Sequence, residues 1–220
     1  VNGIAAGIFP AGGQSCISGS RLLVHRDVIG DFTDRLVSVV KKARVGDPHD
    51  PKTQIGPMAN RPQYERVLQC IADAESAGHR LLLDGRSSCR DTGYYIGPTI
   101  FSDVPNDSDL AQHGVFGPVV STEAWNTEEE VIRTANATVY GLAAGVWSGD
   151  VARAMRMAEQ IEAGTVYINN YFNAATQSPV GGFKQSGYGR ENGWEGMRCY
   201  LQTRSVWLST NPHQPDPFSD

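Results

Sequence analysis

The sequence predicts an α/β fold in which helices cover both faces of a mainly parallel sheet. Short apolar segments suited to strands, such as residues 22–24 and 119–125, alternate with longer segments whose apolar residues recur at helical spacing. Repeated strand–helix–strand units of this kind give parallel sheets. The 220 residues, 40% hydrophobic and 20% charged, suffice for one substantial core or for a core with a smaller appendage.

The predicted elements follow one another between turn-forming residues. Strands are expected at residues 22–24, 80–83, 94–101, 119–125, 142–147, 166–168 and 204–209. Helices are expected at residues 28–44, 61–77, 128–136 and 151–162, where apolar side chains line one face. Gly78 and Gly164 end two of these helices, and Thr127 with Glu130 forms a capping box at the start of another.

Charge and cysteine usage restrict the function classes. A net charge of −5 and a pI near 5.5 argue against nucleic-acid binding. No apolar run approaches the roughly 20 residues of a membrane-spanning helix. The four cysteines are far apart and the five histidines are scattered, so neither a disulfide framework nor a metal site is expected. We therefore predict a cytoplasmic protein without a metal ion.

One cysteine stands in a setting that favours chemistry. Cys16 ends the run Phe-Pro-Ala-Gly-Gly-Gln-Ser-Cys, in which the glycines allow a tight turn and close approach to a substrate. Free N–H groups near a sulfur can stabilise both a thiolate and an oxyanion. An unpaired cysteine is more often a small buried apolar residue. The surrounding turn nevertheless favours Cys16 as a catalytic nucleophile.

Four motifs in order carry a resemblance to a known family. The first surrounds Cys16, the second is Val-Phe-Gly-Pro-Val at residues 115–119, and the third is Gly-Thr-Val-Tyr-Ile-Asn at residues 164–169. The fourth is Ser-Pro-Val-Gly-Gly-Phe-Lys-Gln-Ser-Gly at residues 178–187. Together they resemble the signatures of the aldehyde dehydrogenase superfamily, from Gly7 to about Leu208. The resemblance covers its C-terminal catalytic and oligomerisation portion only.

The resemblance implies NAD(P)-dependent oxidation of an aldehyde to a carboxylic acid, through a thiohemiacetal and a thioester on Cys16. It implies that the Cys16 backbone N–H is one oxyanion donor. It implies cofactor contacts from Phe116, with Gln63 and Arg66 reaching the adenine-side ribose of NAD or NADP. The residues implied to line the substrate channel are Phe172, Asn173, Ala174 and Val180.

The sequence departs from the family pattern at several positions. Gly114 stands where the family has a glutamate that holds the nicotinamide ribose, and Ala11 stands where many members have asparagine. Val180 replaces a frequent aromatic residue, which leads us to expect a roomier pocket for bulky or aromatic aldehydes. The family's general-base glutamate and main cofactor-binding domain precede the cysteine by more than fifteen residues. We therefore expect a missing upstream domain and an isolated chain inactive as a dehydrogenase.

The predicted organisation has three parts: a catalytic domain at residues 1–196, an oligomerisation strand at residues 197–210 and a disordered tail at residues 211–220. A homodimer or homotetramer acting on a small-molecule aldehyde is expected. Two other readings stay open. The first alternative is a non-catalytic oligomerisation module. The second is a cysteine-dependent esterase, in which His113 approaches Cys16.

Overall fold

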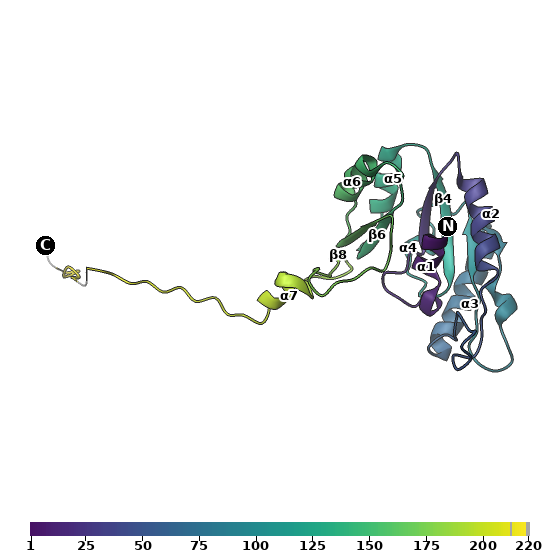
Figure 1. Cartoon of the computed structure of the whole chain (residues 1–220), viewed down its shortest axis with the longest axis horizontal. Coiled ribbons are helices and arrows are strands. Elements are labelled where there is room, and N and C mark those ends of the chain that lie inside the picture. Colours follow the sequence, from purple (N-terminus) through teal and green to yellow (C-terminus); the bar gives the residue numbers. More distant parts are fainter. Residues whose placement is uncertain (212, 219–220) are drawn as a thin grey trace.

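The central sheet has four strands in the order β1–β4–β3–β2. Figure 1 labels β4 of this sheet, with α2 beside it. The computed structural model describes residues 1–211 and 213–218. β1 (Arg21–His25) and β3 (Thr99–Ser102) each run parallel to β4 (Val119–Trp125), whereas β2 (Arg80–Leu83) is antiparallel to β3. The predicted α/β class with a mainly parallel sheet is thereby confirmed.

Two smaller sheets stand beside this one. β6 (Ala143–Val146) and β7 (Thr165–Ile168) form a parallel pair, and β5 (Tyr140–Gly141) pairs antiparallel with β8 (Phe183–Lys184). The third motif thus contributes β7 and the fourth contributes β8. All strand pairings of the described residues are confined to these three sheets.

Helices cover both faces of the central sheet, as the repeated units predicted. On one face, α1 (Asn2–Ile8) and α2 (Ile29–Val40) bury Ile8 and Leu36 against Leu22, Val24 and Val120. On the other face, α3 (Arg61–Ser76) buries Val67 and Ile71 against Phe101 and Val119. Residues 119 and 120 therefore point to opposite cores, as the two-residue period of a strand requires.

A third core lies under α5 (Glu128–Asn136) and α6 (Val151–Gln160). Its buried members are Val131, Val146, Ala154 and Met157, and Leu23 of β1 packs against it. The remaining helical segments are short: η1 (Pro10–Gly13), η2 (Gly85–Ser88), α4 (Asp109–Gln112) and α7 (Gly193–Arg198). Among the residues that the structure describes, no helix is both long and apolar enough to cross a bilayer.

The strand predicted at residues 94–101 is only partly formed. Its amino half is irregular because Gly97 donates its backbone N–H to the Gly85 carbonyl of η2, at 2.9 Å, and because Pro98 has no N–H to donate. Ladder pairing with β4 begins only at Thr99, whose N–H reaches the Pro118 carbonyl. The first half of the predicted strand is therefore a loop.

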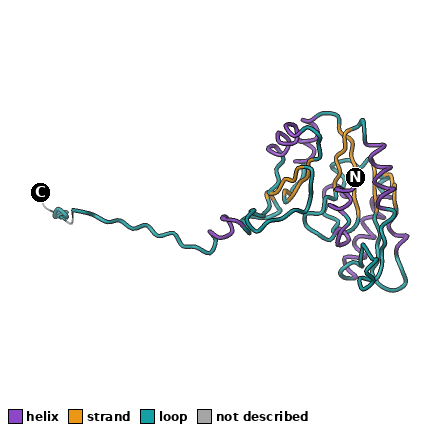
Figure 2. The backbone as a smooth tube through the Cα atoms, viewed as in Figure 1, coloured by secondary structure: helices purple, strands orange, loops and turns teal. Residues whose placement is uncertain are grey.

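The segment beyond α7 leaves the body of the molecule as an extended arm, drawn as loop in Figure 2. Val206, Trp207 and Leu208 are between 83% and 95% exposed. No strand of the described residues pairs with this arm, so the strand predicted at residues 204–209 has no ladder within this chain. Its pairing with another chain stays a prediction. The predicted tail at 211–220 lies partly outside the described residues.

Candidate functional site

The turn that carries Cys16 has an unusual backbone. Ala11, Gly12 and Gly13 in η1 all have positive φ values, of 52°, 63° and 68°. A Cβ added at Gly13 would overlap the Gly117 carbonyl oxygen, so only glycine allows the first and second motifs to touch. Ser18 N–H then donates to the Ser15 carbonyl at 3.0 Å and closes a turn over Cys16.

Gln14 holds this turn in place from both ends of its amide. Its Oε1 accepts a hydrogen bond from the Ala59 backbone N–H, and its Nε2 donates to the Ala11 carbonyl, each at 2.9 Å. The residue thus ties the loop before α3 to the cysteine turn. The glutamine of the first motif has a structural use that its sequence position alone does not reveal.

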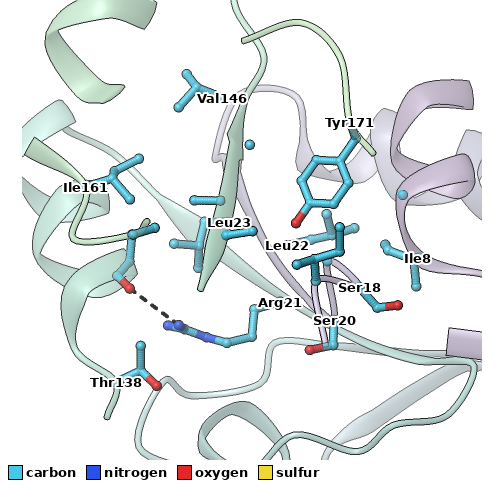
Figure 3. A pocket seen from close by; sticks show the side chains of 18 of the residues that line it. Ile8, Ser18, Ser20, Arg21, Leu22, Leu23, Thr138, Val146, Ile161 and Tyr171 are labelled. Carbon is cyan, nitrogen blue, oxygen red and sulfur yellow. Dashed lines mark hydrogen bonds between the residues drawn. The ribbon is translucent and has the colours of Figure 1, made fainter. Parts of the chain in front are cut away.

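Cys16 is exposed, and its backbone N–H donates to no group among the described residues. It lies at the border of a cavity of about 950 Å³, which we call the β1–β6 cavity because it runs along those two strands. In Figure 3, Leu22 and Leu23 of β1 lie between Val146 and Ile161 on one side and Tyr171 and Ile8 on the other. A free amide and an open thiol beside a cavity suit attack on a carbonyl carbon.

The second motif lies against α3, and α3 determines its conformation. Gln63 Nε2 donates to the carbonyl oxygens of Val115 and Phe116, both at 2.9 Å, and Arg66 Nη2 donates to the Gly114 carbonyl at 2.8 Å. These bonds support Phe116 in a left-handed conformation, with φ of 53°. Gln63 and Arg66, which were predicted to contact the cofactor, thus use these side-chain N–H groups to bind backbone carbonyls of the second motif and its neighbour.

Gly114 makes room for the Phe116 ring. A Cβ at position 114 would lie 3.2 Å from Phe116 Cε2, tighter than ordinary van der Waals contact. Phe116 is 44% exposed and lines the β1–β6 cavity together with Gly114, Arg66 and Cys16. The structure therefore brings the cysteine and the predicted aromatic residue to one cavity. At the position where the family pattern has glutamate, Gly114 leaves no side chain between the backbone and that ring.

Other predicted residues do not line this cavity. Phe172, Asn173, Ala174 and Val180 are absent from its lining, as is the Gln63 side chain. Val180 instead forms an isolated bridge with Glu191. Their contact with a substrate stays a prediction, at positions outside the lining of the β1–β6 cavity.

Tyr171 is the residue of the site that sequence reasoning missed. Its ring packs against the backbone of Gly7, and its hydroxyl lies beside Gly19. Burial raises the pKa of the Tyr171 hydroxyl to about 12, and nearby Tyr167 adds to the effect. It immediately precedes the predicted Phe172, whose ring meets it edge-on with centroids 5.4 Å apart. Its position two residues after the third motif pointed to this loop but did not distinguish it from Phe172.

His113 lies beside an aspartate one helical turn away. Its Nε2 lies 3.5 Å from Asp109 Oδ1, and its side chain is 68% exposed. No hydrogen bond joins His113 to Cys16 in residues 1–211 and 213–218. The same residues contain no group of three or more His, Cys, Asp or Glu side chains placed to hold a metal ion.

Comparison with known proteins gives one family. The aldehyde dehydrogenase family model matches residues 1–206. The chain is 43% identical over 211 residues to a betaine aldehyde dehydrogenase of Brucella anthropi, covering 94% of this chain but only 43% of that relative. The chain thus spans less than half the length of this relative.

Solved structures agree with this result. An NAD-dependent aldehyde dehydrogenase from Sinorhizobium meliloti superposes with a TM-score of 0.93 at 37% identity, covering 99% of this chain and 43% of that one. A Staphylococcus aureus betaine aldehyde dehydrogenase in complex with NAD+ gives a TM-score of 0.93 at 34% identity, covering 100% and 44%. At these identities the likeness extends beyond a shared fold.

Proposed function

Because this chain belongs to the aldehyde dehydrogenase family, we propose that Cys16 is the nucleophile with which the whole protein oxidises an aldehyde to a carboxylic acid. The observation that carries the proposal is the position of Cys16: an exposed thiol three residues after a left-handed glycine turn, at the border of the β1–β6 cavity, with its own N–H free.

The chemistry follows from that geometry. The Cys16 sulfur attacks the aldehyde carbon and forms a thiohemiacetal, and the carbonyl electron pair moves onto oxygen as the C–S bond forms. The Cys16 N–H then donates a hydrogen bond to that oxygen. A donor of this kind contributes about 2.7–4 kcal/mol to transition-state stabilisation. Oxidation leaves a Cys16 thioester, and water releases the acid and regenerates the thiol.

The residues present fit the nicotinamide end of a dinucleotide. Phe116 presents an exposed aromatic ring at the cavity that Cys16 borders, and Gly114 has no side chain that would crowd this ring. NAD, when bound, accepts the hydride that leaves the aldehyde carbon. Gln63 and Arg66 serve this site by holding the carbonyls of residues 114–116. The assay described below, repeated with NADP+ in place of NAD+, measures which of the two cofactors the protein uses.

The isolated 220 residues are proposed to be inactive as a dehydrogenase. The chain spans 43% of the Brucella anthropi relative, and the rest of such a protein would supply most of the cofactor contacts and the general base. For the whole protein we propose a preference for bulky or aromatic aldehydes, supported by the small Val180 side chain. A homodimer or homotetramer is supported by the exposed apolar arm. The cytoplasmic location stays a prediction.

The test uses the complete gene product with NAD+ and benzaldehyde or acetaldehyde. Aldehyde-dependent NADH formation is expected, with a loss of at least a thousandfold in Cys16→Ser, whereas Cys199→Ser leaves the rate within twofold. NADH formation that survives Cys16→Ser contradicts the proposal. Hydrolysis of a nitrophenyl ester by Cys16 without NAD+, and with no aldehyde oxidation, favours the esterase alternative.

A further inference from the structure

Cys16 belongs to a loop whose two ends meet. Gly19 donates its backbone N–H to the Gly7 carbonyl at 3.1 Å, and this bond closes the base of the segment from residue 7 to residue 19, which we call the Cys16 loop. Gly7 is the penultimate residue of α1, and β1 begins two residues after Gly19. Because Cys16 lies within this loop, the conformation of its base helps to determine where the sulfur and the backbone N–H are placed.

The Tyr171 ring occupies space that three glycines leave open. A Cβ added at Gly7 would lie 3.0 Å from Tyr171 Cδ1, and one added at Gly145 of β6 would lie 2.8 Å from Tyr171 Cδ2. Both separations are shorter than ordinary van der Waals contact. A Cβ at Gly19 would lie 3.8 Å from the Tyr171 hydroxyl oxygen. The ring is therefore packed between α1 and β6, and its hydroxyl end lies at the base of the Cys16 loop.

The backbone around Tyr171 restricts where its ring can lie. Asn169 and Phe172 both have positive φ values, of 54° and 61°, a region that is uncommon for a bulky residue such as phenylalanine. The Asn169 side-chain amide donates to the Ser148 carbonyl and accepts from the Ser148 N–H, each at 2.9 Å. Strained backbone persists where neighbouring contacts enforce it, and it is concentrated at functional sites.

The contacts of Tyr171 with the two ends of β6 and α1 come from its ring rather than from its hydroxyl. That hydroxyl forms no hydrogen bond with the part of the chain that the structure describes. Burial raises its pKa to about 12, so the hydroxyl stays protonated at neutral pH and does not serve as a base. Phenylalanine at position 171 would keep the ring contacts with Gly7 and Gly145.

We propose that Tyr171 is a positioning residue, whose ring supports the base of the Cys16 loop and so holds the Cys16 sulfur and N–H in the geometry that attack on an aldehyde requires. The inference rests on the proposed function of Cys16, and it adds a residue that acts through the loop. Misplacing a reacting group by about 1 Å can lower the rate about a hundredfold. Because this support acts on the geometry of attack, its loss should lower kcat and leave KM little changed.

Kinetics of the complete gene product with NAD+ and benzaldehyde test the proposal. Tyr171→Ala is expected to lower kcat about a hundredfold and to change KM by less than about threefold. Tyr171→Phe, which keeps the ring, is expected to have a kcat within about twofold of the natural protein. A natural kcat in Tyr171→Ala, or equal losses in the two variants, would overturn the proposal.

Cys16→Ser in the same assay separates this inference from the proposed function. Activity that survives in Cys16→Ser contradicts the proposed function itself. Activity that is lost in Cys16→Ser but is complete in Tyr171→Ala contradicts only the role of Tyr171.

Glycine substitutions test the same contact from the β6 side of the ring. Gly145→Ala would place a methyl group 2.8 Å from the ring, so it should displace the ring and lower kcat about tenfold. Gly149→Ala is the matched control, because a Cβ there meets nothing within 4 Å, and kcat should stay within about twofold. In Tyr171→Ala, the added Gly145→Ala should cause no further loss, since the ring is gone. Equal losses in both backgrounds would contradict the proposal.

Amide hydrogen exchange of the 220-residue chain, followed by NMR, measures the base of the loop without catalysis. The Gly19 N–H is expected to exchange about tenfold faster in Tyr171→Ala and at the natural rate in Tyr171→Phe. The amides of Ile100 and Phe101 lie in the central sheet and should be unchanged in both variants. Unchanged exchange at Gly19 in Tyr171→Ala would overturn the proposal.

Discussion

The backbone conformation at position 11 explains why many members of the family have asparagine there. Ala11 has a φ of 52°, a region where alanine is strained and where asparagine and glycine are tolerated. Many members of the family carry asparagine there. The left-handed conformation supplies a reason for this preference, because asparagine adopts it at lower cost than alanine.

Ala11→Gly is therefore expected to stabilise the chain. The left-handed conformation costs alanine roughly 1–2 kcal/mol, and glycine loses about 0.5–1 kcal/mol of chain entropy on folding, so the net gain is about 0.5–1 kcal/mol. Ala72→Gly, in the right-handed helix α3, should instead lower the free energy of unfolding by about 1 kcal/mol. Urea denaturation of both variants measures the difference, and a loss of stability in Ala11→Gly would contradict the account.

Gln63 differs from Gln69, the other glutamine of α3, in the groups to which its side-chain amide donates. Because Gln63 Nε2 donates to two carbonyls of the second motif, Gln63→Ala should lower the free energy of unfolding by about 2 kcal/mol. Gln69 on the same helix is exposed and bonds only to Asp73, so Gln69→Ala should cost about 0.2–0.5 kcal/mol. Equal losses in the two variants would show that the contacts with residues 115 and 116 contribute little.

At the scale of elements, the family motifs lock together in pairs through glycine. Gly13 of the first motif lies against the Gly117 carbonyl of the second, and Gly164 of the third lies against the Gly181 carbonyl of the fourth. In both places a Cβ would overlap the carbonyl oxygen. Periodicity and propensity cannot reveal such pairs, since their members lie many residues apart and depend on close approach rather than on local conformation.

The elements themselves were largely predictable, because their signals are local. The strands at 80–83 and 119–125 were predicted with the bounds that the structure has. Thr127 Oγ1 accepts a hydrogen bond from the Glu130 N–H, as the capping box predicted, whereas the Glu130 carboxylate accepts from the Asn126 N–H. The predicted strand at 94–101 begins late because the Gly97 amide bonds to Gly85, a contact across the chain. Likewise, nothing in the local sequence placed Tyr171, rather than Phe172, at the cavity.

An ion-pair cluster joins the end of α3 to η2 and gives a pH-dependent prediction. Arg86 contacts Asp84 at 2.7 Å and Glu75 at 2.6 Å, and its hydrogen bonds to Asp84 hold the pKa of that carboxyl below its ordinary value of 3.8. A carboxyl whose pKa is lower in the folded chain than in the unfolded chain stabilises the fold at pH values above its unfolded pKa. That stabilisation is lost as the pH falls through the lower, folded pKa.

Arg86→Met should accordingly lower the free energy of unfolding at pH 7. The carboxylates are 38% and 39% exposed, so solvent screening limits the loss to about 1 kcal/mol. The difference from the natural chain should shrink as the pH falls below 3.8. Arg61→Met, which removes a more exposed pair with Glu65, is the matched control and should cost less. A loss independent of pH would contradict the electrostatic explanation.

For the molecule as a whole, the proposed assembly rests on the arm beyond α7. Val206, Trp207 and Leu208 are almost fully exposed on an extended, unpaired segment. Exposed edges of this kind pair with other chains. The sequence predicted the strand from its apolar pattern, but a strand needs a neighbour, and no neighbour is found within the described part of this chain.

Light scattering of the chain should therefore give a mass that is a multiple of 23.8 kDa at micromolar concentration. Removal of the residues after Gln202 should give a monomer with an unchanged melting temperature, because the removed side chains cover no core. Trp207→Glu is a milder variant with the same expected result. A monomeric mass for the intact chain would contradict the assignment of the arm.

The central claim, that Cys16 is the nucleophile, is tested most directly by competitive alkylation. Cys16 and Cys199 are both exposed, so a difference in their rates with iodoacetamide reports the surroundings of each thiol rather than access alone. Mass spectrometry of the 220-residue chain should find Cys16 modified at least tenfold faster than Cys199, and an added aldehyde should slow Cys16 selectively. Equal rates at the two residues, with no effect of aldehyde, would contradict the claim.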